Sequence, residues 1–372
     1  MTDSTSSNYD FLVSKADLAS NILNEVVSRE IADGEALLSV DRFAITANNI
    51  TYGVAGDMIG YWQFFPADEP FGRIPVWGIG TVQESKAQGV EVGARYYGYF
   101  PMSSNLVVKP GKVGAHSFAD QAEHRQALPP VYNQYALMTD ENGYPAAHDN
   151  YQMVYRPLFT TSFVIDDFFF DNDFFNGKQV VLSSASSKTA FGTAFLLKDR
   201  DIKTIGLTST NNKAFTEGLG LYDQVVTYDD VAAMDNAVPT IYIDMSGNRA
   251  VLENIHNHFA DQLVYSCGVG ITHWESRDGA DPQSLPGSKP QMFFAPSQIQ
   301  KRNADWGPAE FQSKLSESWL RFIDKVDSWV TIGETSAPAS LENVYLTVLN
   351  GPAPDHAYVL VNDSSVTVSP QQ

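Results

Sequence analysis

The sequence is nearly free of cysteine: Cys267 is the only one among 372 residues. A single thiol excludes a disulfide within the chain and a zinc site built from several cysteines. No apolar run reaches the length of a membrane span, because two aspartates interrupt the most apolar segment, residues 163–170. The N-terminal residues also lack the basic and then apolar pattern of a signal peptide. We therefore expect a soluble, cytoplasmic protein.

Basic residues are scarce as well. The chain has 24 lysines and arginines against 44 aspartates and glutamates, which gives a net charge of −20. A strongly acidic protein repels nucleic acids and anionic membranes, so neither is an expected partner. The length is typical of about two domains, and the hydrophobic content is ample for their cores.

Three catalytic motifs are missing from the sequence. It has no Gly-x-Ser-x-Gly elbow, which disfavours a serine hydrolase. It has no Tyr-x-x-x-Lys pair, which disfavours the acid–base chemistry of short-chain dehydrogenases. Lys188 and Thr189 resemble the end of a P-loop, but the glycines that such a loop needs are absent. We therefore reject a nucleoside triphosphatase.

The first part of the chain is rich in β-forming residues. After a helix predicted at residues 18–31, the β-prone runs 36–40, 76–83, 95–100 and 105–109 are separated by Gly, Pro, Asn and Asp. Runs at this spacing are typical of a small β-barrel or sandwich.

The second part of the chain alternates strands with helices. We predict strands at residues 179–183, 203–207, 224–227, 239–243, 262–267 and 291–295. This pattern indicates a six-stranded parallel sheet, which binds ligands at the carboxyl ends of its strands. A long amphipathic helix is predicted at 308–330, and β-structure is predicted to return at 341–361.

A serine-rich turn, SSASSKT at residues 183–189, follows the first of these strands. The free N–H groups of a helix N-terminus favour a pyrophosphate, so we interpret Ser184, Ser186, Ser187, Lys188 and Thr189 as candidate pyrophosphate ligands. The Gly-x-Gly-x-x-Gly fingerprint is absent, and Lys188 would supply positive charge in its place. The alternative is a βα loop in which a serine or threonine caps the helix.

A second polar turn, TSTNNK at residues 208–213, follows the second strand. A site selective for NAD has an acidic residue near this strand end, and none is present. Hydroxyls, amides and one lysine suit a 2′-phosphate instead, so Ser209, Thr210 and Lys213 predict NADP(H) as the cofactor. The alternative is a capped helix start with a solvated lysine.

Several segments, in this order, resemble the medium-chain dehydrogenase/reductase superfamily, and within it the DUF2855 branch. They are PVWGIGTVQESKAQGVEVG with ARYYGYF (75–100), the interdomain helix entry PLFTTS (157–162), GK (177–178), IYIDMSG (241–247) and VYSCGV (264–269). The resemblance implies an α/β protein with a GroES-like β-rich domain plus a Rossmann doubly wound parallel sheet. The GroES-like substrate and catalytic domain would span residues 1–160, completed by 311–372, and the Rossmann NADP-binding domain would span 161–310. Relatives commonly form dimers, so a homodimer is expected by analogy.

The same resemblance assigns residues to the nicotinamide end of the cofactor. It implies that Cys267, Gly268 and Val269 hold one side of the carboxamide through backbone groups, and that Phe293 and Phe294 hold the other. Ser246, in the IYIDMSG segment, is also assigned to the cofactor. The alternative is ordinary strand core, since a free cysteine is most often a small buried hydrophobe.

The catalytic zinc of many relatives needs ligands that this chain lacks. The matching stretch, ANNITYG at 47–53, has no Cys or His, and we interpret His256 and His258 as polar surface or a helix end. We therefore predict no metal. By resemblance, the loop carrying Tyr52 approaches the nicotinamide, so Tyr52 is the candidate acid and Asn49 the candidate residue that orients substrate or cofactor. Second choices for the acid are Tyr99 and Tyr135, and the alternative for Tyr52 is barrel core with a satisfied hydroxyl.

Together these features predict a zinc-independent, NADPH-dependent oxidoreductase. As the resemblance implies, it would transfer hydride to an activated C=C or C=O of a small, apolar carbonyl compound. The alternative is a non-redox or catalytically silent protein that binds NADP(H) or another ligand on the same fold. The glycine-poor phosphate turn motivates that alternative.

Overall fold

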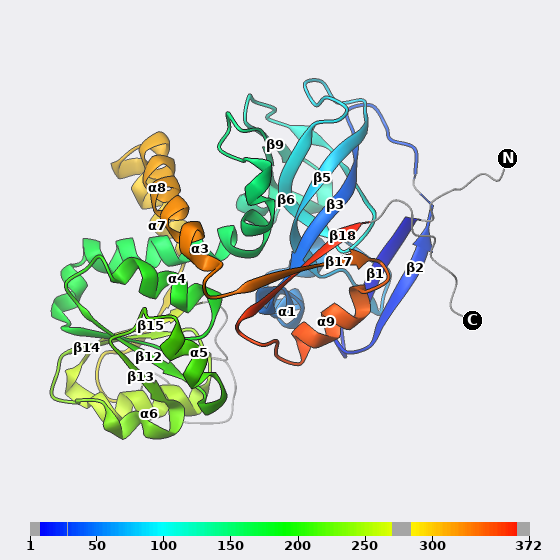
Figure 1. The fold of residues 1–372 in the computed structure, drawn as a ribbon. Coiled ribbons are helices and arrows are strands. Elements are labelled where there is room, and N and C mark those ends of the chain that lie inside the picture. The colour runs from blue at the N-terminus through cyan, green and yellow to red at the C-terminus, as the bar shows by residue number, and fades with distance from the viewer. Residues whose placement is uncertain (1–7, 28, 270–283, 363–372) are drawn as a thin grey trace. The chain divides into compact units, whose positions relative to one another are not determined.

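The computed structural model describes residues 8–27, 29–269 and 284–362. The chain divides into two compact units, one made of residues 1–154 and 331–372 and the other of residues 155–330 (Figure 1). The sequence assigned residues 155–160 and 311–330 to the first domain, whereas here both ranges belong to the second unit. The start of the polar N-terminal segment, residues 1–7, lies outside the described residues.

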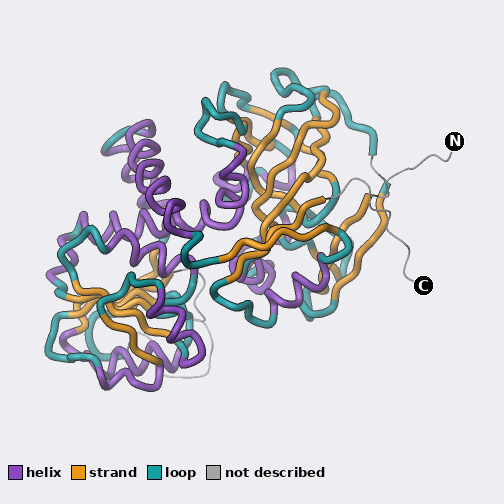
Figure 2. Tube along the Cα trace, viewed as in Figure 1, coloured by secondary structure: helices purple, strands orange, loops and turns teal. Residues whose placement is uncertain are grey.

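The described part of the first unit is built on a nine-stranded sheet and a three-stranded sheet (Figure 2). The large sheet has the order β17-β18-β3-β5-β6-β10-β9-β8, with β7 paired to β3, and the small one has the order β2-β1-β4. The strands are β1 (Asn8–Ser14), β2 (Asn21–Val26), β3 (Ala36–Ile45), β4 (Phe71–Gly72), β5 (Pro75–Ser85), β6 (Arg95–Pro101), β7 (Asn105–Val108), β8 (Pro110–Gly111), β9 (Ser117–Asp120), β10 (Gln134–Leu137), β17 (Thr331–Ala337) and β18 (His356–Asn362). The helices are α1 (Ala47–Val54), α2 (Gly56–Ile59), α9 (Leu341–Leu349) and the first residues of α3 (Asp149–Asp171). The four β-prone runs predicted between residues 36 and 109 are confirmed as β3, β5, β6 and β7.

A close approach of three strands explains why β5 contains glycine. A Cβ added at Gly80 would lie 2.7 Å from the carbonyl oxygen of Ser39 in β3 and 3.0 Å from the ring of Phe100 in β6. A side chain at this position would separate the strands, so glycine lets β3 and the ring of Phe100 pack directly on the backbone of β5.

Two predicted elements of the first unit are wrong. The helix predicted at residues 18–31 is replaced by β2, which pairs antiparallel with β1 from Asn8↔Val26 to Val13↔Asn21. The β-structure predicted across 341–361 begins instead with the helix α9 and becomes a strand only in β18. In both places packing in the tertiary structure overrides a weak local preference.

The described part of the second unit is a six-stranded parallel sheet with helices. Its order is β13-β12-β11-β14-β15-β16, which confirms the predicted doubly wound parallel sheet. The strands are β11 (Gln179–Leu182), β12 (Lys203–Thr208), β13 (Gln224–Thr227), β14 (Thr240–Asp244), β15 (Leu263–Val269) and β16 (Pro290–Phe293). The helices are the rest of α3, α4 (Lys188–Leu197), α5 (Lys213–Gly218), α6 (Arg249–Phe259), α7 (Ala295–Asp305) and α8 (Pro308–Val326).

Alternate residues of each central strand point to opposite faces of this sheet. Val181 and Tyr242 belong to one buried hydrophobic cluster, together with residues of α6. Their neighbours Val180 and Ile241 belong to the other cluster, together with residues of α3 and α4. Burial on both faces is why the strands read as continuous apolar runs in the sequence.

The helix α3 begins earlier than the sequence suggests. The segment 157–162 resembles a helix entry, but the helix begins at Asp149 and Pro157 lies inside it. Proline removes one backbone hydrogen bond, which a helix as long and well packed as this one tolerates.

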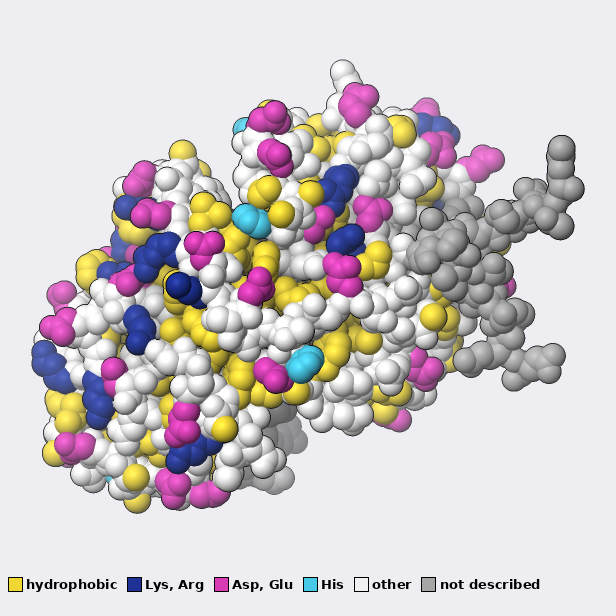
Figure 3. Space-filling model, in the orientation of Figure 1, with side chains coloured by type: hydrophobic (Ala, Val, Ile, Leu, Met, Phe, Trp, Pro, Cys, Tyr) yellow, Lys and Arg dark blue, Asp and Glu magenta, His cyan; other side chains and the backbone are white. Residues whose placement is uncertain are grey.

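Within residues 8–27, 29–269 and 284–362, no helix is both long and apolar enough to cross a membrane. Acidic and basic side chains are interspersed on the face drawn in Figure 3. The net charge of −20 is therefore not concentrated in one field on that face.

Candidate functional site

The turns that carry the predicted cofactor residues share one edge of the parallel sheet. Strands β11, β12, β14, β15 and β16 are all parallel, so their carboxyl ends meet at the same edge. From β11 the chain forms β12 and β13 on one side of that strand and then crosses to form β14 on its other side, which makes the β11–β14 boundary the topological switch point. Open α/β sheets bind ligands at this place.

In the serine-rich turn after β11, a serine adopts a backbone conformation that glycine usually adopts. Ser184 has a φ of 51°, in the left-handed region that glycine normally occupies. Its carbonyl oxygen accepts a hydrogen bond of 2.7 Å from the N–H of Ser187. The side chain of Ser187 then caps α4 by accepting from the N–H of Ala190 at 3.3 Å. The capping alternative is therefore confirmed for Ser187.

Side chains from two neighbouring segments hold this turn in place. The N–H of Ser184 donates to the hydroxyl of Tyr228, directly after β13, at 3.0 Å. The hydroxyl of Tyr222, before β13, donates to the carbonyl oxygen of Ala185 at 2.8 Å. Sequence reasoning missed both tyrosines; the available signal was that they flank the strand next to the second polar turn.

The second turn is tied directly to the first. The side-chain amide of Asn212 donates to the hydroxyl of Ser186 at 3.1 Å. Ser209 and Lys213 are half-buried and Thr210 is exposed, and Lys213 is the first residue of α5. The turn thus presents hydroxyls, amides and an ammonium group, with no carboxylate among residues 208–213.

The end of β14 is organised by a buried carboxylate. Oδ1 of Asp244 accepts hydrogen bonds from the hydroxyls of Ser183 and Ser246, both at 2.8 Å, and from the backbone N–H of Gly247 at 3.2 Å. This fixes the turn after β14 beside the turn after β11. The predicted cofactor residue Ser246 therefore has its hydroxyl engaged with Asp244.

The predicted nicotinamide residues divide into buried and exposed ones. The thiol of Cys267 is 1% exposed, and burial raises its pKa well above the usual range, so it stays protonated. Gly268 is buried, whereas Val269 and Phe293 are half-buried on the same hydrophobic cluster. Phe294 is 61% exposed. A backbone contribution at this edge suits these residues better than thiol chemistry.

His256 lies in the last turn of α6, at a helix end as the sequence suggested, but it is fully buried rather than on the surface. Its Nδ1 lies 2.8 Å from the carbonyl oxygen of Pro286 and its Nε2 lies 2.9 Å from the hydroxyl of Ser266. A carbonyl only accepts, so Nδ1 carries the hydrogen and Nε2 accepts from Ser266. Burial lowers the pKa of His256, which keeps this imidazole neutral. Across the described ranges, no three His, Cys, Asp or Glu side chains are grouped to hold a metal ion.

In the first unit, Tyr52 belongs to a group of tyrosines that we call the phenol cluster: Tyr52, Tyr61, Tyr99 and Tyr132. The ring centroid of Tyr52 lies 4.5 Å from that of Tyr61 and 5.7 Å from that of Tyr99, and the rings of Tyr99 and Tyr132 stack at 4.8 Å. The hydroxyls of Tyr61 and Tyr132 lie 3.2 Å apart. Residues from four different helices and strands thus bring their aromatic rings into one region.

Tyr52 lies in the helix α1 rather than in a loop, and it is 5% exposed. Its hydroxyl accepts a hydrogen bond of 2.6 Å from the side-chain amide of Asn48. The hydroxyl of Tyr99 and the indole N–H of Trp77, both close enough to influence the pKa of Tyr52, are buried without a hydrogen-bond partner in the described residues. Two donors without a partner therefore lie near the hydroxyl of Tyr52.

Burial raises the pKa of every member of the phenol cluster. Each phenol therefore keeps its proton throughout the neutral range. Tyr132 is half-buried and is the most open of the four. Sequence reasoning missed Tyr132, because nothing in the segment 114–153 marks it as part of this cluster.

The amide of Asn49 is largely used inside the protein. Its Oδ1 accepts from the backbone N–H and the hydroxyl of Thr46 at 2.7 and 3.0 Å, and its Nδ2 donates to the carbonyl oxygen of Pro75 at 2.9 Å. Only one amide hydrogen is left for a ligand. The capping of α1 therefore accounts for Asn49 without a substrate.

Arg125 stabilises the phenol cluster through hydrogen bonds. It is 1% exposed and forms an ion pair of 2.8 Å with Asp120. It donates to the carbonyl oxygen of Tyr132 at 2.8 Å and to the hydroxyl of Tyr135 at 3.0 Å. The hydroxyl of Tyr135 in turn donates to the carbonyl oxygen of Tyr99. Tyr135, a second choice for the acid, thus has a structural role.

The sequence model of one protein family, described as Protein of unknown function (DUF2855), matches residues 43–354. The chain belongs to the DUF2855 family. No curated protein matches the sequence.

Solved structures resemble this DUF2855 protein along nearly its whole length. CurA from Vibrio vulnificus in complex with NADPH is 12% identical with a TM-score of 0.63, covering 95% of this chain and 99% of that one. The CurF ER cyclopropanase from the curacin A biosynthetic pathway is 11% identical with a TM-score of 0.58, covering 96% and 100%. The quinone oxidoreductase from Coxiella burnetii is 12% identical with a TM-score of 0.54, covering 95% and 99%. At such low identity the likeness establishes the fold, and the predicted combination of a β-rich domain with a parallel sheet is confirmed.

Proposed function

We propose that this DUF2855 protein is a zinc-independent, NADPH-dependent oxidoreductase that reduces an activated C=C or C=O of a small, apolar carbonyl compound. The observation that carries the proposal is the pair of turns that follow β11 and β12, next to the switch point of the sheet, which Asn212 and Ser186 join. The NADPH in the CurA complex and the quinone oxidoreductase activity named for the Coxiella protein support the same class. In this proposal residues 161–310 bind NADP and the GroES-like part provides substrate and catalytic groups.

The cofactor assignments follow from the turns. Residues 184–189 and the N-terminus of α4 would hold the pyrophosphate, and Ser209, Thr210 and Lys213 would hold the 2′-phosphate. Backbone groups of 267–269 and 293–294, with the turn at Ser246, would hold the nicotinamide end. NADPH, when bound, supplies the hydride.

The phenol cluster suits the proton side of such a reduction. Hydride addition to an enone or carbonyl leaves negative charge on oxygen, which hydrogen-bond donors stabilise before a proton is delivered. The hydroxyl of Tyr52 keeps its proton at neutral pH, and the unused donors of Tyr99 and Trp77 lie beside it. We propose Tyr52 as the acid, with these donors binding a substrate oxygen, and with Asn49 positioning α1 rather than substrate.

The test is cofactor binding followed by turnover. The full-length protein is titrated with NADPH and NADH, and NADPH oxidation is followed with a quinone, an enone and an aldehyde. We expect NADPH to bind at least about tenfold more tightly than NADH, and NADPH to be consumed with at least one acceptor. Absence of dinucleotide binding at any salt concentration would overturn the proposal.

One observation favours the second candidate, a silent NADP(H)-binding protein. The N–H of Ser184, which a phosphate could use, already donates to the hydroxyl of Tyr228. NADPH binding without turnover across a broad panel of carbonyl compounds and quinones would support that candidate.

A further inference from the structure

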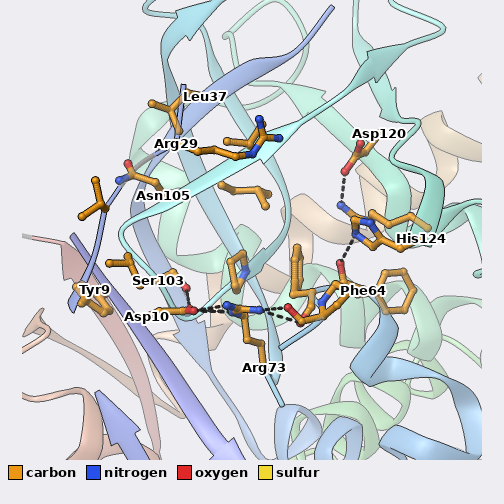
Figure 4. A pocket seen from close by; sticks show the side chains of 18 residues that line it. Tyr9, Asp10, Arg29, Leu37, Phe64, Arg73, Ser103, Asn105, Asp120 and His124 are labelled. Carbon is orange, nitrogen blue, oxygen red and sulfur yellow. Dashed lines mark hydrogen bonds and ion pairs between the residues drawn. The ribbon is translucent and has the colours of Figure 1, made fainter. Parts of the chain in front are cut away.

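A cavity of about 390 Å³ lies in the first unit, and neither Tyr52 nor Asn49 is among its lining residues (Figure 4). Its walls are mainly apolar and come from Tyr9, Leu37, Phe64, Phe65, Leu106 and Val107. Cavities of roughly 300–1,000 Å³ with apolar walls and a few polar groups are typical small-molecule sites. The cavity is also larger than the roughly 150 Å³ void that accepts benzene in another protein.

The two charged groups on one side of the cavity, Arg73 and Asp10, are paired with each other. Arg73 forms an ion pair with the buried carboxylate of Asp10 and donates to the carbonyl oxygen of Pro66. Ser103 donates its hydroxyl to the same carboxylate, as the dashed lines in Figure 4 show. A ligand at this side of the cavity would meet an ion pair without net charge rather than an unpaired charged group.

The charged groups on the opposite side of the cavity, Asp120 and Arg125, are also paired with each other. Oδ2 of Asp120 accepts from Arg125, and its Oδ1 accepts from the backbone N–H groups of Lys109 and Ala122, both at 3.0 Å. Three more guanidinium hydrogens of Arg125 are donated to Asn133, Tyr132 and Tyr135. A charged ligand would have to break one of these pairs, which is costly for a buried charge.

The third arginine of the lining, Arg29, is paired with Glu35 through two hydrogen bonds of 2.8 Å, and His124 is a further polar group of the lining. Nε2 of His124 lies 3.3 Å from the carbonyl oxygen of Phe64 and therefore carries the hydrogen of the neutral ring. Nδ1 is then an acceptor on an exposed side chain that lines the cavity. Such an acceptor suits the hydroxyl of an alcohol.

We propose that this cavity is a second small-molecule site, for an uncharged, mainly apolar molecule that carries a hydroxyl group. The apolar walls supply the affinity, and the saturated ion pairs select against both anions and cations. The net charge of −20 disfavours an anion further. The site does not depend on the proposed oxidoreductase activity.

The occupant of this site would contact residues that hold the phenol cluster. The ring of Phe64 lines the cavity and lies 5.2 Å from that of Tyr99 and 5.4 Å from that of Tyr132. Arg125 also lines the cavity and donates to the carbonyl oxygen of Tyr132. We therefore expect binding to slow amide hydrogen exchange in residues 123–135.

The probe is octan-1-ol, with octanoate and octylammonium as charged molecules of the same chain length. Calorimetry on the full-length protein is expected to give one site for octan-1-ol, with both charged probes at least about tenfold weaker. Val107→Phe, which fills the cavity, is expected to weaken octan-1-ol at least about tenfold. Val92→Phe, in the exposed β5–β6 turn at 65% exposure, adds the same group elsewhere and is expected to change nothing.

A folding defect would not be mistaken for loss of the site. Val26→Phe also narrows the cavity, and Val26 is already 38% exposed, so this variant is expected to keep the melting temperature of the parent while losing octan-1-ol. Three results would each overturn the proposal: no binding of octan-1-ol, octanoate binding as tightly as octan-1-ol, or binding unchanged in both filled variants.

Discussion

The hydroxyl of Tyr228 lies 3.0 Å from the backbone nitrogen of Ser184 and accepts its hydrogen bond. This contact joins the end of β13 to the turn after β11, although β12 lies between these two strands in the sheet. Ser184 adopts a left-handed backbone conformation that is unfavourable for a residue with a side chain. The tyrosine therefore helps to stabilise a turn that the glycine fingerprint of dinucleotide-binding proteins builds with glycine.

Replacing Tyr228 with phenylalanine tests this contact. The variant leaves the N–H of Ser184 without its partner, which we expect to lower the free energy of unfolding by about 1 kcal/mol. NADPH binding should weaken several-fold, because the turn that we propose as the pyrophosphate site loses a hydrogen bond that holds it. Chemical denaturation and NADPH titration measure the two effects. Tyr358→Phe, in β18 of the first unit, is the matched control, and tighter NADPH binding in Tyr228→Phe would contradict this role.

Lys213→Ala tests the selection of the 2′-phosphate. We expect NADP⁺ binding to weaken at least about tenfold while NAD⁺ binding changes little, because only NADP⁺ carries the phosphate that the ammonium group would meet. The salt dependence of NADP⁺ binding should also become shallower. Lys203→Ala is the control, since Lys203 is exposed at the opposite end of the same strand β12. Equal losses for both cofactors, or none, would count against the assignment.

The second unit could be predicted well from the sequence, because its strands are buried on both faces and read as uninterrupted apolar runs. The first unit was harder. Residues 18–31 have no strong periodicity, and β2 forms because β1 offers it a pairing partner. Residues 341–349 are apolar enough for either a strand or a helix, and packing of α9 on the β-rich unit decides the outcome.

The candidate site was only partly visible in the sequence. The two polar turns were found because each follows a predicted strand, which places them at one edge of the sheet. The role of Ser184 depends on a φ angle and on Tyr228, and neither can be read from the local sequence. The phenol cluster is assembled from four segments, so sequence reasoning found Tyr52 but not its partner Tyr132. Asn49 looked functional because its capping role appears only in three dimensions.

Cys267 is expected to be chemically inert in the folded protein. It is 1% exposed, and burial raises the pKa of its thiol, so little thiolate is available. A thiol reagent should find no reactive group in the native protein and about one per chain after denaturation, as expected for a single cysteine. Cys267→Ala should keep NADPH binding within about twofold, because only backbone groups are assigned to the cofactor there. Fast modification of the native thiol would contradict the backbone role.

The raised pKa of Tyr135 predicts that the folded protein loses stability in alkaline solution. Full burial is the main cause that raises the pKa of its phenol to about 12, above the ordinary value of 10.0. The unfolded chain then loses this proton from pH 10 upward, whereas the folded chain keeps it until about pH 12. The stabilisation is therefore complete below pH 10 and is lost as the pH rises from 10 to about 12, by roughly 2–3 kcal/mol. Melting temperatures across this range should fall less steeply for Tyr135→Phe, even though that variant starts from a lower stability because Arg125 and the carbonyl oxygen of Tyr99 lose a partner. An identical slope in the two proteins would show that Tyr135 ionises as it does in the unfolded chain.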